Sequence, residues 1–194
     1  MSISRRTLML GAAAAAGQAS LSSLARAAYA QPNDGTYTAD EIISEGHQFF
    51  GSAAQGLAQT VERMFQNSGR PNGYVLGQEG GGALIAGLRY GEGTLRTKNA
   101  GEHKVYWQGP SIGWDFGGNG DRTMILVYNL PSVDSVYRYY AGVNGSAYLI
   151  AGLGVSVYAH DPVTVAPIRT GLGARLGVNI GYLKFTRAPT WNPF

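Results

Sequence analysis

From Gly73 onward the sequence is a succession of short segments rich in Val, Ile, Leu, Tyr and Trp, punctuated by Gly, Asn, Asp and Pro. Branched and aromatic residues between such punctuation predict strands joined by turns. We expect strands at 74–78, 82–89, 93–97, 104–108, 111–116, 123–129, 147–158, 163–167 and 174–186. We expect tight turns at 91–93, 118–121 and 144–145. Strands this numerous and this often interrupted by Gly predict a closed or nearly closed antiparallel barrel, because closure removes exposed edges.

Helices are predicted before the strands and once within them. Thr38 and Glu41 have the spacing of a capping box, so a helix begins there, breaks near Gly51 and resumes over about 52–66, with a stop at 67–69. A second pattern, over 131–140, places Val133, Val136, Tyr137 and Tyr140 on one helical face with Ser132 as N-cap. The predicted fold class is therefore α+β, a small antiparallel β-barrel-like domain with N-terminal helices and one short inserted helix.

The first thirty residues have the features of an export signal. Arg5 and Arg6 precede an alanine-rich apolar run, and small residues lead to Ala30. The run is shorter than the roughly 20 residues that span a bilayer, so we expect cleavage near Ala30 and no stable membrane span. The paired arginines and a late Arg26 favour the twin-arginine route, with general secretion as the alternative, and cleavage after Ala27 is a second option. We expect residues 31–37 to be a short exposed linker, 38–190 to be one domain, and the protein to be periplasmic.

Charge and cysteine content narrow the function classes. Three of the fifteen basic residues and none of the twelve acidic ones lie in the signal, so the rest of the chain is formally neutral. The basic character of the whole chain is then no argument for nucleic-acid binding. With no cysteine, neither a disulfide nor a thiolate contributes.

The sequence contains fragments of catalytic motifs without their contexts. Residues 109–113 match the G-x-S-x-G pattern around Ser111, but a strand and turn follow in place of the required helix. The three histidines, His47, His103 and His160, are widely separated and lack the spacing of metal ligands. We therefore expect no enzyme, no metal and no cofactor, and keep a serine hydrolase through Ser111 as the last alternative.

The order of the glycine-rich runs resembles that of a lipid-binding family. The runs GGGALIA at 80–86, PSIGWDFGG at 110–118 and TMILVYNL at 123–130 are similar to those of the SYLF domain. More closely, the chain after the signal resembles the bacterial envelope integrity protein A family. The resemblance implies a periplasmic β-barrel packed with helices, a non-enzymatic role in envelope integrity and stress resistance, and a phospholipid or other lipidic envelope component as ligand.

Two groups of side chains are candidates for contact with a lipid or a partner protein. Arg89, Arg96, Lys98 and Lys104 surround one predicted hairpin and could meet anionic headgroups, or form an ordinary solvated strand face. Phe49 and Phe50 lie on an apolar helix face that could meet lipid or pack against the barrel.

The function we expect is a lipid-binding or protein-docking module of the periplasm. A small outer-membrane barrel is the alternative, since 174–187 alternates in polarity, but most predicted strands are shorter than a membrane strand requires.

Overall fold

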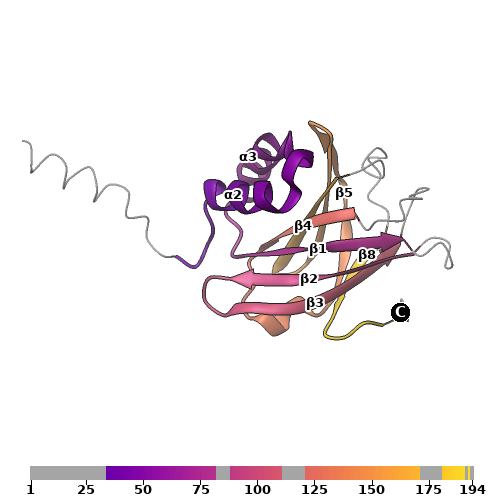
Figure 1. Cartoon of the computed structure of the whole chain (residues 1–194). Helices are drawn as coiled ribbons and strands as arrows, with labels where there is room; N and C mark the ends of the chain where they lie inside the picture. The colour runs from indigo at the N-terminus through magenta and orange to yellow at the C-terminus, as the bar shows by residue number, and fades with distance from the viewer. Residues whose placement is uncertain (1–33, 82–87, 111–120, 171–180, 191, 193–194) are drawn as a thin grey trace, which may run out of the picture. The chain divides into compact units, whose positions relative to one another are not determined.

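A closed antiparallel barrel of eight strands forms the body of the protein. The computed structural model describes residues 34–81, 88–110, 121–170, 181–190 and 192, and 35–194 form one compact unit. The strands are β1 (Gly73–Gly81), β2 (Leu88–Thr97), β3 (Gly101–Pro110), β4 (Asp121–Tyr128), β5 (Tyr139–Ile150), β6 (Leu153–His160), β7 (Val163–Arg169) and β8 (Tyr182–Thr186). They close in the order β1-β2-β3-β8-β5-β6-β7-β4 (Figure 1). The predicted barrel and fold class are confirmed.

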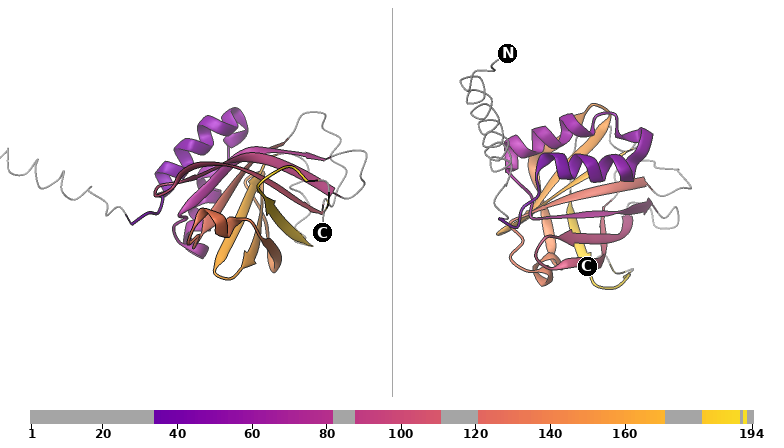
Figure 2. Two further views of the ribbon diagram at one scale, coloured as in Figure 1. Left: turned by 90° about the horizontal axis from the view of Figure 1, so that it is seen from below. Right: turned by 60° about the vertical axis from the view of Figure 1, so that its left-hand side comes forward.

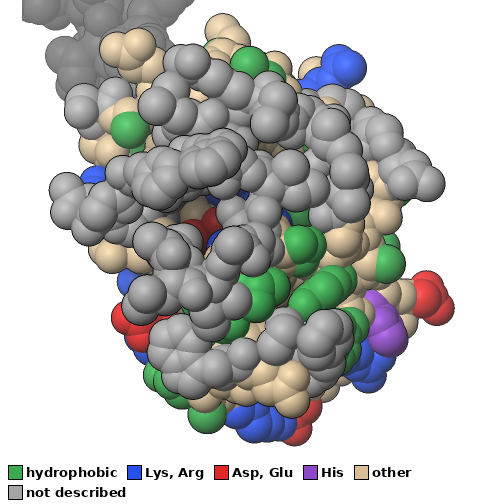
Figure 3. Space-filling view, turned by 90° about the vertical axis from the view of Figure 1, so that its right-hand side faces the viewer, with side chains coloured by type: hydrophobic (Ala, Val, Ile, Leu, Met, Phe, Trp, Pro, Cys, Tyr) green, Lys and Arg blue, Asp and Glu red, His purple; other side chains and the backbone are tan. Residues whose placement is uncertain are grey.

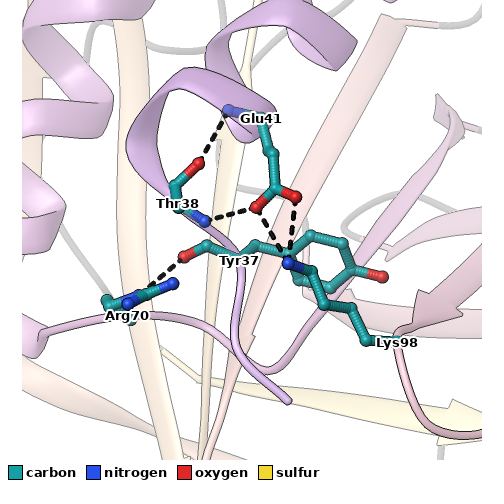
Figure 4. Close-up of polar contacts among 5 residues, drawn as sticks. All are labelled: Tyr37, Thr38, Glu41, Arg70 and Lys98. Atoms are coloured by element: carbon teal, nitrogen blue, oxygen red, sulfur yellow. Dashed lines mark hydrogen bonds and ion pairs between the residues drawn. The ribbon is translucent and has the colours of Figure 1, made fainter. Parts of the chain in front are cut away.

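Two helices, α2 (Ala39–Phe50) and α3 (Leu57–Ser68), lie across one side of the barrel and are joined by the short 3₁₀ helix η1 (Gly51–Ala54) (Figure 2). The predicted capping box is present: Glu41 N–H donates to Thr38 Oγ1 at 3.2 Å, and Thr38 N–H donates to Glu41 Oε2 at 2.7 Å. Lys98 adds an ion pair to Glu41 at 2.9 Å, which ties the start of α2 to the β2–β3 hairpin (Figure 4). The break near Gly51 is confirmed, but α3 begins at Leu57 rather than near 52, because the tighter η1 occupies the intervening residues.

The domain has two apolar cores, one on each face of the barrel wall. The outer core joins the helices to the outside of β1, β4, β6 and β7. Its buried members include Ile42, Phe50, Leu57, Val61, Met64, Tyr74, Met124, Leu126, Tyr128, Val155, Ala166 and Ile168. The inner core fills the lumen. Its buried members include Val75, Leu95, Val105, Trp107, Ile125, Val127, Tyr140, Tyr158, Val163, Val165, Leu183 and Phe185. The alternation of side chains along each strand produces this division.

Two predicted turns are wrong, because the glycines there lie within strands of the barrel. Residues 91–93 lie in the middle of β2, where Gly91 is opposite Trp107 on β3, and a Cβ at Gly91 would overlap the indole ring. Residues 144–145 lie within β5, at an irregularity in its pairing with β6 between Gly142 and Ala147. Glycine in a strand often marks such close approaches and bulges.

Two predicted elements differ in extent. The segment 147–158, predicted as one strand, is the end of β5, a turn with positive φ at Ala151 and Gly152, and most of β6. The inserted helix is a single 3₁₀ turn, η2 (Val133–Val136), and Tyr140 belongs to β5. The face predicted for this segment is nonetheless correct, since Val136 and Tyr140 are buried in the inner core. The predicted signal, the predicted strand at 111–116 and most of the predicted turn at 118–121 and of the predicted strands at 82–89 and 174–186 lie outside the described residues.

Candidate functional site

A buried carboxylate, Glu79, organises the end of the lumen where β1 finishes. Glu79 is 7% exposed. Arg169 on β7 donates to it from Nε at 2.7 Å and from Nη2 at 3.1 Å. Trp107 on β3 donates its indole N–H at 2.7 Å. Strand alternation explains the placement, because Glu79 follows Val75 and Gly77 on the inward face of β1. These contacts tie β1, β3 and β7 together.

The electrostatics of this cluster keep Glu79 ionised. Burial by itself raises the pKa of Glu79, but the charges of Arg169 and then Arg89, with the hydrogen bonds from Arg169 and Trp107, outweigh it and hold the pKa at about 2. A buried carboxylate that receives such charge-assisted hydrogen bonds stays negatively charged across the physiological pH range.

Arg89 extends the cluster across the lumen. Its Nη2 donates to the Tyr158 hydroxyl at 2.8 Å, so β2 is linked to β6, which stands across the ring of strands. The Arg89 Nε is buried and has no hydrogen-bond partner among the residues described. We call Glu79, Arg89, Trp107, Tyr158 and Arg169 the charged end of the lumen. Figure 3 looks onto this end of the molecule, where acidic and basic side chains are visible between the residues drawn in grey.

A second feature lies on the other side of the same wall. A groove of about 350 Å³ runs between the outer face of β1, β2 and β3 and the segment that follows β8, and Glu79 and Trp107 of the charged end also contribute to its lining. The lining residues from β1, β2 and β3 include Gln78, Tyr90, Glu92, Tyr106 and Gln108. Thr186 at the end of β8, and Pro189 and Thr190 after it, line the opposite side. We call this the outer groove. It combines aromatic walls with a polar rim, which is common in binding sites.

The segment after β8 is held over the barrel by specific contacts. Gln108 Nε2 donates to the main-chain oxygen of Asn192 at 2.6 Å, and the Asn192 N–H donates to Thr190 Oγ1 at 3.2 Å. Thr186 Oγ1 donates to the oxygen of Ala188 at 2.8 Å. These contacts hold the segment after β8 in place, and its Pro189 and Thr190 form one wall of the outer groove.

The four basic candidates from the sequence do not form one cluster. Arg89 points into the lumen, as described above. Arg96 pairs with Glu45 of α2 at 2.8 Å and with Glu102 at 3.0 Å. Lys98 is engaged by the cap of α2. The described contacts of Arg96 and Lys98 therefore attach α2 to the barrel.

Lys104 is the basic candidate that borders the outer groove. Its Nζ pairs with Glu92 at 3.1 Å and lies 5.5 Å from the centre of the Tyr106 ring. Both Glu92 and Tyr106 line the groove.

The aromatic candidates Phe49 and Phe50 belong to the outer core. Phe50 is 2% exposed, and Phe49 packs partly buried beside it with the rings 5.1 Å apart. Arg122 covers Phe49, with its guanidinium 5.9 Å from the ring centre. Of the two roles considered for this helix face, packing against the barrel is the one in which the structure places it.

The described residues were also compared with the other kinds of site considered from the sequence. Its three histidines lie on α2, β3 and β6, and it contains no group of three or more His, Asp or Glu side chains arranged to hold a metal. Ser111 falls outside the described residues. None of the helices described has the length and apolar character needed to cross a membrane.

Sequence reasoning missed the charged end and the outer groove. The available signal was the alternation along β1 and β2, which places Glu79 on the face of Val75, and Arg89 on the face of Leu95. A charged residue that continues a buried face indicates an interior ion pair.

Comparisons with known proteins agree with this architecture. No protein with a curated description matches the sequence. A crystal structure of a β-barrel-like, uncharacterized protein from Brucella abortus is 64% identical, with a TM-score of 0.77, and the match covers 82% of this chain and 99% of that one. The model of the family described as envelope integrity protein A matches residues 35–194. The chain therefore belongs to the envelope integrity protein A family.

Proposed function

We propose that this protein supports the bacterial envelope from the periplasm as a non-enzymatic docking module, with the outer groove as its contact site. Family membership supports the envelope-related role. The pattern of the first thirty residues, which is typical of an export signal, supports the periplasmic location.

The observation that carries the proposal is the preformed groove beside Tyr106. Its aromatic walls, Tyr90 and Tyr106, provide large contact areas on rigid strands, and Gln78 and Glu92 supply polar groups at the rim. Tyrosine is enriched where binding energy concentrates in protein interfaces. The groove also lies on strands whose outer faces are free of the two helices at this point, since the outer core centres on β4, β6 and β7.

A protein partner fits these features better than an enclosed lipid. The lumen is occupied by apolar side chains, so acyl chains find little room among the interior residues described. The groove volume of about 350 Å³ lies at the lower end of the range for small-molecule pockets, about 300–1,000 Å³. It suits a few side chains of a docked protein.

Two features support a barrel surrounded by water over the outer-membrane alternative. Helices cover the outside of four strands, and β2 and β3 carry outward ion pairs such as Arg96–Glu102 and Lys104–Glu92. The outer face of a membrane barrel is an apolar band instead. Carbonate extraction of cell envelopes should release the protein, and retention in the membrane pellet would contradict this placement.

The docking proposal can be tested by complementation. In a strain that lacks the protein, a Tyr106→Ala variant should fail to restore resistance to detergent and cell-wall antibiotics. A Leu149→Ala variant is the control, because Leu149 is 56% exposed on β5 and does not line the groove. Both variants must accumulate to the wild-type level, and their melting temperatures must lie within a few degrees of the wild-type value. Equal resistance of the two strains would refute a role for the groove.

A crosslinking experiment identifies the class of occupant. A photo-reactive residue at Gln78, an exposed lining residue, should give a specific protein adduct that Tyr106→Ala abolishes and that a probe at exposed Glu62 on α3 does not form. Native mass spectrometry of the purified protein provides the opposite outcome. A stoichiometric lipid that is lost in Tyr106→Ala but kept in Leu149→Ala would contradict protein docking.

A further inference from the structure

The outer groove contains a glycine that the packing of the described barrel does not explain. Gly77 and Gly91 are required within the wall, because a Cβ at either position would overlap the Trp107 ring. Gly80 lines the groove, its φ lies outside the left-handed region, and a Cβ there would meet no described atom within 4 Å. Glycine in a strand often marks a place where a ligand or another backbone approaches closely. The exposed Gly80 therefore leaves open space at the groove floor.

A buried acceptor lies in the same row of residues across the three strands. Gly80 is opposite Tyr90 in the β1–β2 pairing, and Tyr90 is opposite Gln108 in the β2–β3 pairing. Gln108 lines the groove and is 1% exposed. Its Nε2 donates to Asn192, but its Oε1 has no hydrogen-bond partner among the described residues. Since buried polar atoms are nearly always hydrogen-bonded, this oxygen indicates that the groove accommodates a donor from another molecule.

A peptide backbone has the donor and the shape that these two residues require. The carboxamide of a glutamine side chain has a donor side and an acceptor side, as a peptide unit does. The donor side of Gln108 already binds a main-chain oxygen, that of Asn192 at 2.6 Å. Its acceptor side matches a main-chain N–H. A backbone can also lie directly over Gly80, because no side chain rises from the floor there.

We propose that the outer groove binds an extended segment of the partner protein, whose main-chain N–H donates to Gln108 Oε1 and whose backbone lies over Gly80. The inference rests on the proposed docking function and names the part of the partner that is recognised. Main-chain hydrogen bonds provide affinity in such recognition, and contacts with neighbouring side chains provide specificity. Tyr90 and Tyr106, which line the groove, supply those contacts.

The first experiment titrates the protein with N-acetyl-trialanine methylamide and follows the backbone amides of β1, β2 and β3 by NMR. This peptide has main-chain N–H donors and only methyl side chains. We expect saturable shifts at the amides that border the groove, at concentrations up to tens of millimolar. The same peptide with every amide nitrogen methylated has no N–H donor and should give none. Absence of shifts with the first peptide, or equal shifts with both, would overturn the proposal.

Substitutions at Gly80 test the open space at the groove floor. Gly80→Ala should weaken peptide binding several-fold and Gly80→Val at least tenfold, because their side chains occupy the space that the backbone needs. Both variants should fold, since branched side chains suit a strand and the position is exposed. Ala141→Val is the matched control, because Ala141 is exposed on β5 and does not line the groove. Equal binding by Gly80→Val and Ala141→Val would overturn the proposal.

A second pair of variants tests the acceptor. Gln108→Met keeps an unbranched side chain without the Oε1 acceptor and should weaken binding several-fold. Because it also loses the bond to Asn192, Thr190→Val is the control for a loosened segment, since it removes the acceptor of the Asn192 N–H. Equal losses in the two variants would refute the role of Gln108. Should Gln108→Met fail to fold, the Gly80 variants carry the comparison.

A titration with maltose tests another class of occupant. The hydroxyl groups of a sugar are also donors that a glutamine oxygen accepts. Maltose should give no saturable shift at the groove. Tighter binding of maltose than of the peptide, with loss in Gly80→Val, would assign the groove to a saccharide and overturn the proposal.

Complementation distinguishes a failure of this inference from a failure of the docking proposal. Gly80→Val should fail to restore resistance, as Tyr106→Ala should. If Tyr106→Ala fails and Gly80→Val restores full resistance, the groove is a contact site but not for an extended segment, and this inference alone is refuted. If both variants restore full resistance, the docking proposal is refuted and this inference with it.

Discussion

Replacing Glu79 by Gln should destabilise the barrel strongly at neutral pH. Gln keeps one acceptor oxygen but turns an NH₂ group toward Arg169 or Trp107, both donors, and leaves the arginines without their carboxylate. Breaking a buried pair in this way costs about 3–5 kcal/mol. A pKa of about 2 in place of the ordinary 4.5 gives a consistent figure of about 3 kcal/mol.

The pH dependence follows from the sign of that pKa difference. Because the folded-state pKa of Glu79 is lowered, its contribution is complete above the unfolded value near 4.5 and disappears as the pH falls toward 2. The gap in stability between wild type and Glu79→Gln should therefore be full at pH 7 and shrink below pH 4.5.

Urea denaturation at pH 7 and pH 3, together with thermal denaturation at pH 7, measures both effects. The melting temperature of Glu79→Gln should fall by roughly 10 °C at pH 7, given about 2–4 °C per kcal/mol for a domain of this size. Glu102→Gln is the matched control: Glu102 is 62% exposed in its pair with Arg96, so its loss should cost less than about 1 kcal/mol. A Glu79→Gln penalty as small as that of Glu102→Gln, or one independent of pH, would refute the reasoning.

Three further variants test other parts of the fold by the same denaturation assay. Gly91→Ala should destabilise by about 1–3 kcal/mol, because its Cβ would overlap the Trp107 ring; an unchanged midpoint would contradict that close approach. Tyr128→Phe should be neutral or stabilising, because the buried hydroxyl has no partner among the described residues, and a loss above about 1 kcal/mol would reveal a hidden bond. Thr38→Ala should lose about 1 kcal/mol through the cap of α2, whereas Ser132→Ala, whose side chain makes no cap bond, should lose less.

Local signals in the sequence were sufficient for the helices and the barrel. The capping box at Thr38 and Glu41 is a contact between residues three apart, so spacing alone predicts it. The same holds for the apolar face predicted over 131–140, because Val136 of η2 and Tyr140 at the start of β5 are close in sequence.

Signals that depend on distant residues were misinterpreted. Gly91 and Gly93 have the composition of a turn, but both lie within β2, where Gly91 faces the Trp107 ring on the next strand and Gly93 lies close to the backbone of Leu76 and Gly77 on β1. Glu79 stands among glycines, which is typical of an exposed loop, and its partner Arg169 is 90 residues away. Register between strands decides such contacts, and a single sequence does not contain it.

The short strand β8 has a consequence for how the chain matures. Among the described residues it joins β3 to β5 through three residue pairs on each side, and it is the last of the described strands in sequence order, so its two neighbours are made earlier. Until residues 182–186 leave the ribosome, β3 and β5 have free edges, and the ring cannot close. An incomplete chain is therefore most exposed to edge pairing with another copy between the synthesis of β5 and that of β8. A chaperone would protect the chain most during the same interval.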